Sequence, residues 1–244
     1  MSKFLLLSPR RGAAVAAAEY RDFLQASQLA PEQLEQRMFD TADAQVGSTA
    51  GVTGIFVGGS SLNMTAPARD EWHRRVVDKL SELPHQPLPC LFVCFGAGLI
   101  AESFGGAVGN THPEKSGETI VELTADGAQD ELFGRLPARF SALTGHTENV
   151  TRIPEGATLL ASGPTCPVQA YRLGTHTWAT QFHAEMDPLG MATRMGFYRN
   201  HGYFDDADFD DIVTELQAVD TTWSNAVLRG FVDMCDKRAG QLSA

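Results

Sequence analysis

The chain has 244 residues, of which 43% are hydrophobic and 20% are charged, as in ordinary folded globular proteins. Its formal net charge of −11 argues against nucleic acid or an anionic membrane surface as a main partner. No apolar run approaches the roughly 18 residues of a membrane-spanning helix, and no basic-then-apolar leader opens the sequence. We therefore expect a cytoplasmic protein that is neither exported nor inserted in a membrane.

The cysteine pattern gives no sign of a disulfide framework or of a metal site. The four cysteines are Cys90, Cys94, Cys166 and Cys235, with neither the density of a disulfide-stabilised fold nor the spacing of metal ligands. We expect reduced thiols, no metal and no cofactor. The length suits one domain over residues 1–244, with C-terminal helices at about 205–240.

The first third of the chain alternates strands and helices. Residues 3–8 form a short apolar run that predicts a buried strand, and the Ala-rich residues 13–29 predict a helix. Residues 34–46 are ambiguous, with 37–40 as a candidate second strand, and residues 54–57 are a clearer one. This strand-helix-strand order predicts an α/β fold with a largely parallel sheet.

Residues 90–104 predict a strand that turns sharply into a helix, with Cys94 at the corner. This geometry is typical of a nucleophile elbow, which lifts the side chain above the sheet edge. The positive end of the helix would favour the thiolate, and the N–H of Phe95 would face a developing oxyanion. Gly96 keeps the turn uncrowded. A lone cysteine after a buried strand is, however, more often a packing residue.

The rest of the chain is predicted as short strands followed by helices. A helix at 68–83 precedes the elbow. After it we expect two strands within 107–123, a short helix at 130–140, strands at 159–161, 168–173 and 177–182, and helices at 191–200, 205–216 and 221–237. His112 lies between the first two of these strands and is interpreted as a solvated loop residue.

The strand at 177–182 ends in His183-Ala184-Glu185. Alternation along an extended segment places His183 and Glu185 on the same side. One can then serve as base to a cysteine while the other orients the base.

With residues 54–60, 145–150 and 153–156, these two motifs resemble the class I glutamine amidotransferases, the family with a Cys-His-Glu triad. The similarity runs from about residue 4 to 203 and suggests a stand-alone domain like the amidotransferase of GMP synthase. It implies an α/β, flavodoxin-like open and mostly parallel sheet with helices on both faces, plus a small antiparallel element.

The resemblance also implies a reaction. Cys94 would attack the side-chain amide of glutamine, His183 would carry the proton to the leaving ammonia, and Glu185 would orient the histidine. The N–H groups of Phe95 and Gly59 would form the oxyanion hole, although a glycine after a strand is also common turn punctuation. Water would then hydrolyse the thioester.

Three positions depart from the family pattern. Phe92 stands where the family has glycine, and Ala184 stands where it has proline. Gly98 replaces a glutamine that helps to hold the substrate, which removes a polar contact.

The substrate is expected to contact Gly98 together with the segment His146-Thr147-Glu148. Glu148 stands where the family commonly has aspartate and would meet the amino-acid end of the substrate. The alternative interpretation of this segment is a surface turn before a strand.

Three functions remain open from the sequence. The first is a glutaminase that feeds ammonia to a separate synthase partner. The second is a hydrolase of another γ-glutamyl compound, which the loss of glutamine at Gly98 favours. The third is a non-catalytic regulatory relative, because fold alone does not fix function. A homo-oligomer is compatible with all three.

Overall fold

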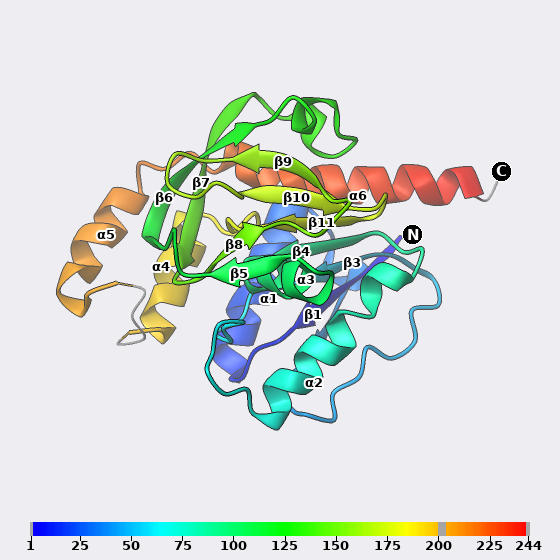
Figure 1. Ribbon diagram of the computed structural model, residues 1–244, viewed down its shortest axis with the longest axis horizontal. Helices are drawn as coiled ribbons and strands as arrows, with labels where there is room; N and C mark the ends of the chain where they lie inside the picture. The colour runs from blue at the N-terminus through cyan, green and yellow to red at the C-terminus, as the bar shows by residue number, and fades with distance from the viewer. Residues whose placement is uncertain (1, 200–203, 243–244) are drawn as a thin grey trace.

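A computed structural model describes residues 2–199 and 204–242, and its centre is a mixed sheet (Figure 1). Within these residues the main sheet has nine strands in the order β2-β1-β3-β4-β11-β10-β9-β6-β7. Neighbouring strands are parallel from β2 to β11 and antiparallel from β11 to β7. The strands are β1 Lys3–Ser8, β2 Leu34–Met38, β3 Val52–Val57, β4 Cys90–Val93, β6 Glu114–Leu123, β7 Arg139–His146, β9 Thr158–Ser162, β10 Ala170–Leu173 and β11 Thr177–Thr180.

A small second sheet pairs β5, Ala107–Gly109, with β8, Asn149–Arg152, in antiparallel fashion. It corresponds to the small antiparallel element expected from the sequence. The α/β class and the parallel arrangement around the cysteine strand are confirmed, because β4 lies between β3 and β11.

Helices cover both faces of the main sheet (Figure 1). They are α1 Ala13–Ser27, α2 Glu71–Leu80, α3 Phe95–Ser103, α4 Pro188–Phe197, α5 Phe209–Leu216 and α6 Thr222–Leu242. Alternate side chains of β1 separate the two layers: Phe4 packs with α1 and α6, whereas Leu5 packs with α2 and α3. This is the pattern expected of a strand buried on both faces.

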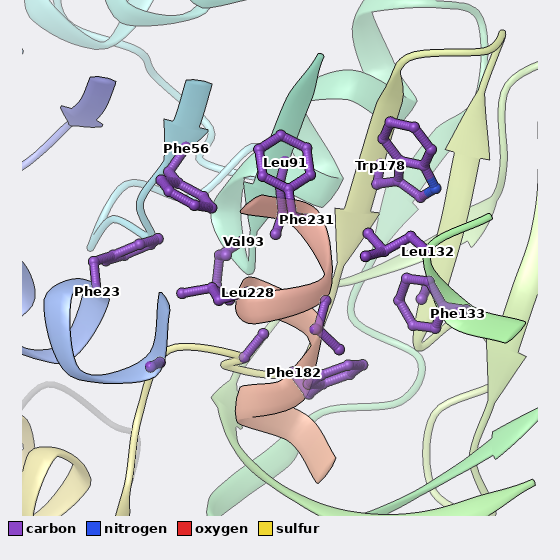
Figure 2. Close-up of a cluster of buried hydrophobic side chains, with 14 of the residues drawn as sticks. Phe23, Phe56, Leu91, Val93, Leu132, Phe133, Trp178, Phe182, Leu228 and Phe231 are labelled. Carbon is purple, nitrogen blue, oxygen red and sulfur yellow. The ribbon is translucent and has the colours of Figure 1, made fainter. Parts of the chain in front are cut away.

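The core under α1 and α6 is rich in aromatic rings. Figure 2 shows Phe231 of α6 between Phe56 of β3 and Trp178 of β11. The ring centroids are 5.1 Å apart for Phe56 and Phe231 and 6.2 Å apart for Trp178 and Phe231. These tilted and edge-to-face contacts are favourable aromatic geometries. The apolar side of α6, the helix expected at 221–237, is therefore a packing surface.

α6 is the longest helix of the described residues, yet none of their helices is both long and apolar enough to cross a membrane. The four cysteines are all unpaired.

The predicted elements are present with adjusted ends, except for one. The prediction of a helix at 130–140 is wrong, because only a short 3-10 turn, Phe133–Arg135, forms there. The Asp130 carboxylate accepts the N–H groups of Leu132 and Phe133 and also the indole N–H of Trp178. This local capping favours a compact turn over a longer helix.

Several of the adjusted boundaries differ by three residues or more. The second strand occupies 34–38 instead of 37–40, and the helix expected at 68–83 is shortened to 71–80. The helix expected at 191–200 begins earlier, at Pro188, where Asp187 caps the N–H of Gly190. Residue 200 lies outside the described residues.

Candidate active site

Cys94 occupies a strained corner between β4 and α3. Its φ of 54° and ψ of −103° are uncommon for any residue but glycine. The corner is tied to the sheet because the Cys94 N–H donates to the Thr180 carbonyl at 2.7 Å. Phe95 is the first residue of α3, so its N–H belongs to the first turn, which lacks partners within the helix. The predicted elbow is present, with a half-buried Cys94 at its apex.

Phe92 and Gly96 occupy complementary space in this corner. A Cβ at Gly96 would lie 2.9 Å from the Cβ of Phe92, which is closer than real Cβ atoms approach. Phe92 itself is fully buried. The elbow thus tolerates phenylalanine at this position because residue 96 has no side chain.

His183 reaches the cysteine because β11 runs beside β4. Val93 pairs with Thr180, and the chain beyond this pair is fixed by a hydrogen bond from the His183 N–H to the Leu143 carbonyl at 2.8 Å. The imidazole lines the same pocket as Cys94, and Cys94 is among the groups that raise the pKa of His183. Two segments 89 positions apart in the sequence (183 − 94) thereby converge at one point.

Glu185 lies behind His183. Its Oε1 is 2.8 Å from Nδ1 of His183, and the Glu185 carboxylate is fully buried. Burial opposes the charged imidazole, but the Glu185 carboxylate and Cys94 outweigh it and raise the pKa of His183 to about 9. Burial likewise opposes a charged Glu185, but His183 and Arg194 lower its pKa. The pair therefore stabilises the imidazolium that forms when His183 takes the proton of the Cys94 thiol.

Gly59 lies in the loop that follows β3, next to both reactive side chains. A Cβ built on Gly59 would be 3.6 Å from the Cβ of Cys94 and 3.2 Å from Cε1 of His183. The backbone of Gly59 is thus close enough to line the position of an oxyanion beside Phe95.

An asparagine that no sequence motif marks holds the backbone on both sides of Glu185. Nδ2 of Asn225, on α6, donates to the carbonyls of Ala184 and Met186 at 2.9 Å each. These bonds restrain the segment where Ala184 replaces the proline of the family pattern. No local signal could have identified Asn225, because its partners are about 40 positions away in the sequence.

The pocket in front of Cys94 and His183 brings together the predicted substrate residues. Gly98, His146, Thr147 and Glu148 all line it, and its lining also includes several residues of α4. Of the predicted site residues, Gly59 and Glu185 lie behind this lining and not in it.

Glu148 has a structural task that the sequence did not reveal. Oε1 accepts the N–H of Met64 and Oε2 accepts the N–H of Thr65, each at 2.8 Å. The carboxylate therefore anchors the loop after β3, and only its remaining lone pairs are available to a substrate.

The imidazole of His146 also contacts a protein side chain and is not free to bind the substrate through Nε2. Its Nε2 lies 2.8 Å from Oε2 of the buried Glu114. Glu114 in addition accepts hydrogen bonds from Thr119, Thr144, Thr165 and Gln169. Hydrogen bonds from His146, Thr165 and Thr119 outweigh the effect of burial and lower the pKa of Glu114 to about 2.

Cys166 completes a second group of cysteine, histidine and glutamate with His146 and Glu114, within 4.8 Å of one another. Its chemistry differs from that of Cys94. Burial raises the pKa of the Cys166 thiol to about 11, and its Sγ donates to the Val168 carbonyl. A buried, protonated thiol away from a helix start is a poor nucleophile, and Glu114 already has five donors. We interpret this group as structural.

Replacing Glu114 with glutamine is expected to destabilise the fold by about 1–3 kcal/mol, because an amide would face donors arranged for a carboxylate. The Glu114 pKa lies below its usual 4.5, so its contribution is present above pH 4.5 and is lost as pH falls through about 2. Urea denaturation should show the difference from wild type shrinking over that range. Glu118→Gln, exposed on the same strand, is the control; equal effects of the two variants would refute the role of Glu114.

The comparisons with known proteins agree with this geometry. The family model described as "Glutamine amidotransferase class-I" matches residues 27–200, more than half of the chain. A glutamine-hydrolysing GMP synthase subunit from Methanocaldococcus jannaschii is 35% identical over 100 residues, 41% of this chain and 52% of that protein. The protein of the same name from Thermococcus kodakarensis is 32% identical over 133 residues, 54% of this chain and 65% of that one. The matches thus span about half to two thirds of these relatives.

Solved structures show the same fold. A crystal structure described as a GMP synthase subunit from Thermoplasma acidophilum matches with a TM-score of 0.68 and 23% identity, covering 100% of this chain and 98% of that one. A glutamine amidotransferase from Thermotoga maritima matches with a TM-score of 0.77 and 15% identity, covering 96% and 98%. By the extent of the family match, the chain belongs to the class I glutamine amidotransferase family.

Proposed function

We propose that this protein hydrolyses the side-chain amide of glutamine and releases ammonia. The observation that carries the proposal is the strained corner at Cys94 with the His183–Glu185 pair beside it. This arrangement combines an accessible thiol with a base and a group that orients the base. Membership of the amidotransferase family supports the same substrate.

The reaction follows from the placement of these groups. The Cys94 sulfur bonds to the amide carbon, while the thiol proton passes to His183. The resulting oxyanion is held by the N–H of Phe95 and of Gly59. When the carbon–nitrogen bond breaks, His183 returns the proton to the leaving ammonia. Water, deprotonated by His183, then attacks the γ-glutamyl thioester and frees glutamate and the thiol.

The substrate's amino-acid end is proposed to lie against Gly98, Thr147 and Glu148. Because the imidazole of His146 is engaged by Glu114, that residue would contribute through its backbone. The free lone pairs of Glu148 suit a positively charged amino group.

A separate ammonia-accepting synthase is the proposed partner. The relatives in Methanocaldococcus jannaschii and Thermococcus kodakarensis are named as subunits of GMP synthase. Leu189 and Phe197 of α4, the helix that also lines the pocket, expose 65% and 41% of their surface and could contact such a partner. A reactive thiol also requires reducing surroundings, in keeping with a cytoplasmic location.

Hydrolysis of another γ-glutamyl compound is the second candidate. It is favoured by Gly98, where the family has a substrate-binding glutamine, and by an apolar side of the pocket formed by Met186, Met191 and Met195. A leaving group larger than ammonia could pack against these flexible thioethers.

Ammonia release by the purified protein separates these candidates. Free L-glutamine and a γ-glutamyl dipeptide are assayed side by side, with Cys94→Ala as the blank. Ammonia from glutamine that is absent in the variant supports the glutaminase. Cleavage of the dipeptide alone would replace the proposal with the γ-glutamyl hydrolase, and turnover of neither would count against both when the protein is assayed alone.

Replacing Gly98 with glutamine is expected to raise kcat/KM for glutamine by roughly 2- to 10-fold, the worth of one added substrate hydrogen bond. The position has room, since a Cβ would meet Met64, Val108 and Glu148 only at 3.4–3.7 Å. Gly98→Ala is the matched control, because it adds the Cβ and helix propensity without the amide. An unchanged or lower kcat/KM would mean that the pocket is shaped for a different substrate.

A further inference from the structure

We propose that Arg194 is a positioning residue of the active site: it holds the Glu185 carboxylate in the orientation that fixes His183. The inference rests on the proposed function, because it assigns Glu185 to the catalytic triad. Arg194 lies on α4, outside the motifs that suggested the triad.

Arg194 contacts the same oxygen of Glu185 that contacts His183. Nη2 of Arg194 is 3.0 Å from Oε1 of Glu185, and the same oxygen is 2.8 Å from Nδ1 of His183. Both the guanidinium and the carboxylate are buried, with 3% and 0% of their side chains exposed. Water therefore cannot replace the cation, and rotation of the carboxylate away from His183 would break both contacts at once.

Arg194 is itself held from the opposite side by α1. Its Nε donates to Oδ2 of Asp22 at 3.0 Å, and its Nη1 is 3.8 Å from Oε1 of Glu19. α4 approaches α1 closely here, since a Cβ at Gly190 would lie 2.8 Å from Oδ1 of Asp22. The guanidinium is thus fixed between α1 and the triad, and a planar, rigid group suits that task.

Several charged or titratable groups surround this contact and bear on any pH measurement. They are His183 and Cys94 at the site, Arg10 after β1, Glu19, Arg21 and Asp22 on α1, and Tyr198 after α4. Removal of Arg194 alone would change both the orientation of Glu185 and the local charge. Removal of the Arg194 and Asp22 charges together keeps the net charge constant and isolates orientation.

The test therefore compares Arg194→Met, Asp22→Asn and the double variant. We expect Arg194→Met to lower kcat for glutamine roughly 10- to 100-fold, the range for losing an outer partner that orients a site ligand, while KM changes little. The double variant should stay impaired, and Arg194→Lys should recover part of kcat. Arg229→Met is the control, because Arg229 donates only to the Thr222 carbonyl in its own helix among its described hydrogen bonds. If the double variant regains wild-type kcat, Arg194 merely neutralises Asp22 and the inference is overturned.

A second readout does not depend on turnover. Alkylation of Cys94 by iodoacetamide, followed by mass spectrometry against pH, reports the thiolate that the imidazolium stabilises. In the double variant the rise of alkylation should shift to higher pH, because a misaligned Glu185 supports the imidazolium less well. An unshifted profile would overturn the inference.

The two readouts separate the inference from the proposed function. A wild-type protein that fails to hydrolyse glutamine while the double variant still shifts the alkylation profile would refute the glutaminase and leave the role of Arg194 standing. Normal hydrolysis by the wild-type protein, with no effect of Arg194→Met on kcat or on alkylation, would refute the role of Arg194 and leave the glutaminase standing. If Arg194→Met does not fold, as judged by circular dichroism, the double variant, in which net charge is conserved, takes its place, and wild-type kcat with a wild-type alkylation profile in that variant would refute the inference.

Discussion

Replacing Cys94 with alanine is expected to abolish glutamine hydrolysis, lowering kcat by on the order of 10⁴-fold or more, as for other enzymes that lose their nucleophile. No other side chain at the corner can form the thioester. The fold should survive, because Cys94 is only half-buried and the backbone bond from its N–H to Thr180 does not need the side chain. Ammonia release measures the activity, and urea denaturation measures the stability.

Cys166→Ala is the matched control for this variant. Cys166 is a buried cysteine near a histidine and a glutamate, so it tests whether that second group carries the chemistry. We expect Cys166→Ala to lose stability but to keep turnover. Full activity in Cys94→Ala, or loss of activity in a folded Cys166→Ala, would contradict Cys94 as the nucleophile and favour Cys166.

Replacing His183 with asparagine is expected to lower kcat by on the order of 10³- to 10⁴-fold, since one imidazole serves both proton transfers. KM should change less, because His183 contacts the reacting bond more than the amino-acid end of the substrate. The raised pKa of His183 gives a second expectation. Its contribution to stability is complete below pH 6.5 and is lost as pH rises through about 9, so urea denaturation of the asparagine variant should lack this dependence.

His112→Asn is the control for this variant, because His112 is exposed and bonds to Thr111 outside the pocket lining. A His183 variant with kcat close to that of His112→Asn would exclude His183 as the base.

The sequence predicted the parts of this site that depend on local pattern. The apolar run 90–93 and the glycines after Cys94 specify a strand, a tight corner and a helix, and the structure has all three. Alternation along an extended segment predicts His183 and Glu185 on one side; both lie beyond the end of β11, and Nδ1 of His183 is 2.8 Å from Oε1 of Glu185. The sequence does not predict that β11 lies beside β4, because strand order depends on contacts across the whole chain.

The parts that were missed depend on distant contacts. Asn225 and Arg194 act on the segment around Glu185 from α6 and α4, and nothing near them in the sequence marks a role. The substrate contact of Glu148 stays a prediction, but the sequence does not reveal that two backbone N–H groups of a loop more than 80 positions away donate to its oxygens. Such long-range hydrogen bonds have no periodicity from which they could be predicted.

The most direct test of the proposed chemistry is to trap the thioester. Wild-type protein is mixed with L-glutamine, quenched with acid within the first turnovers, digested and analysed by mass spectrometry. The proposed mechanism predicts one added γ-glutamyl group, located on Cys94 and absent from Cys94→Ala. A γ-glutamyl group on Cys166, or glutamate formed with no adduct on Cys94 at any quench time, would contradict it.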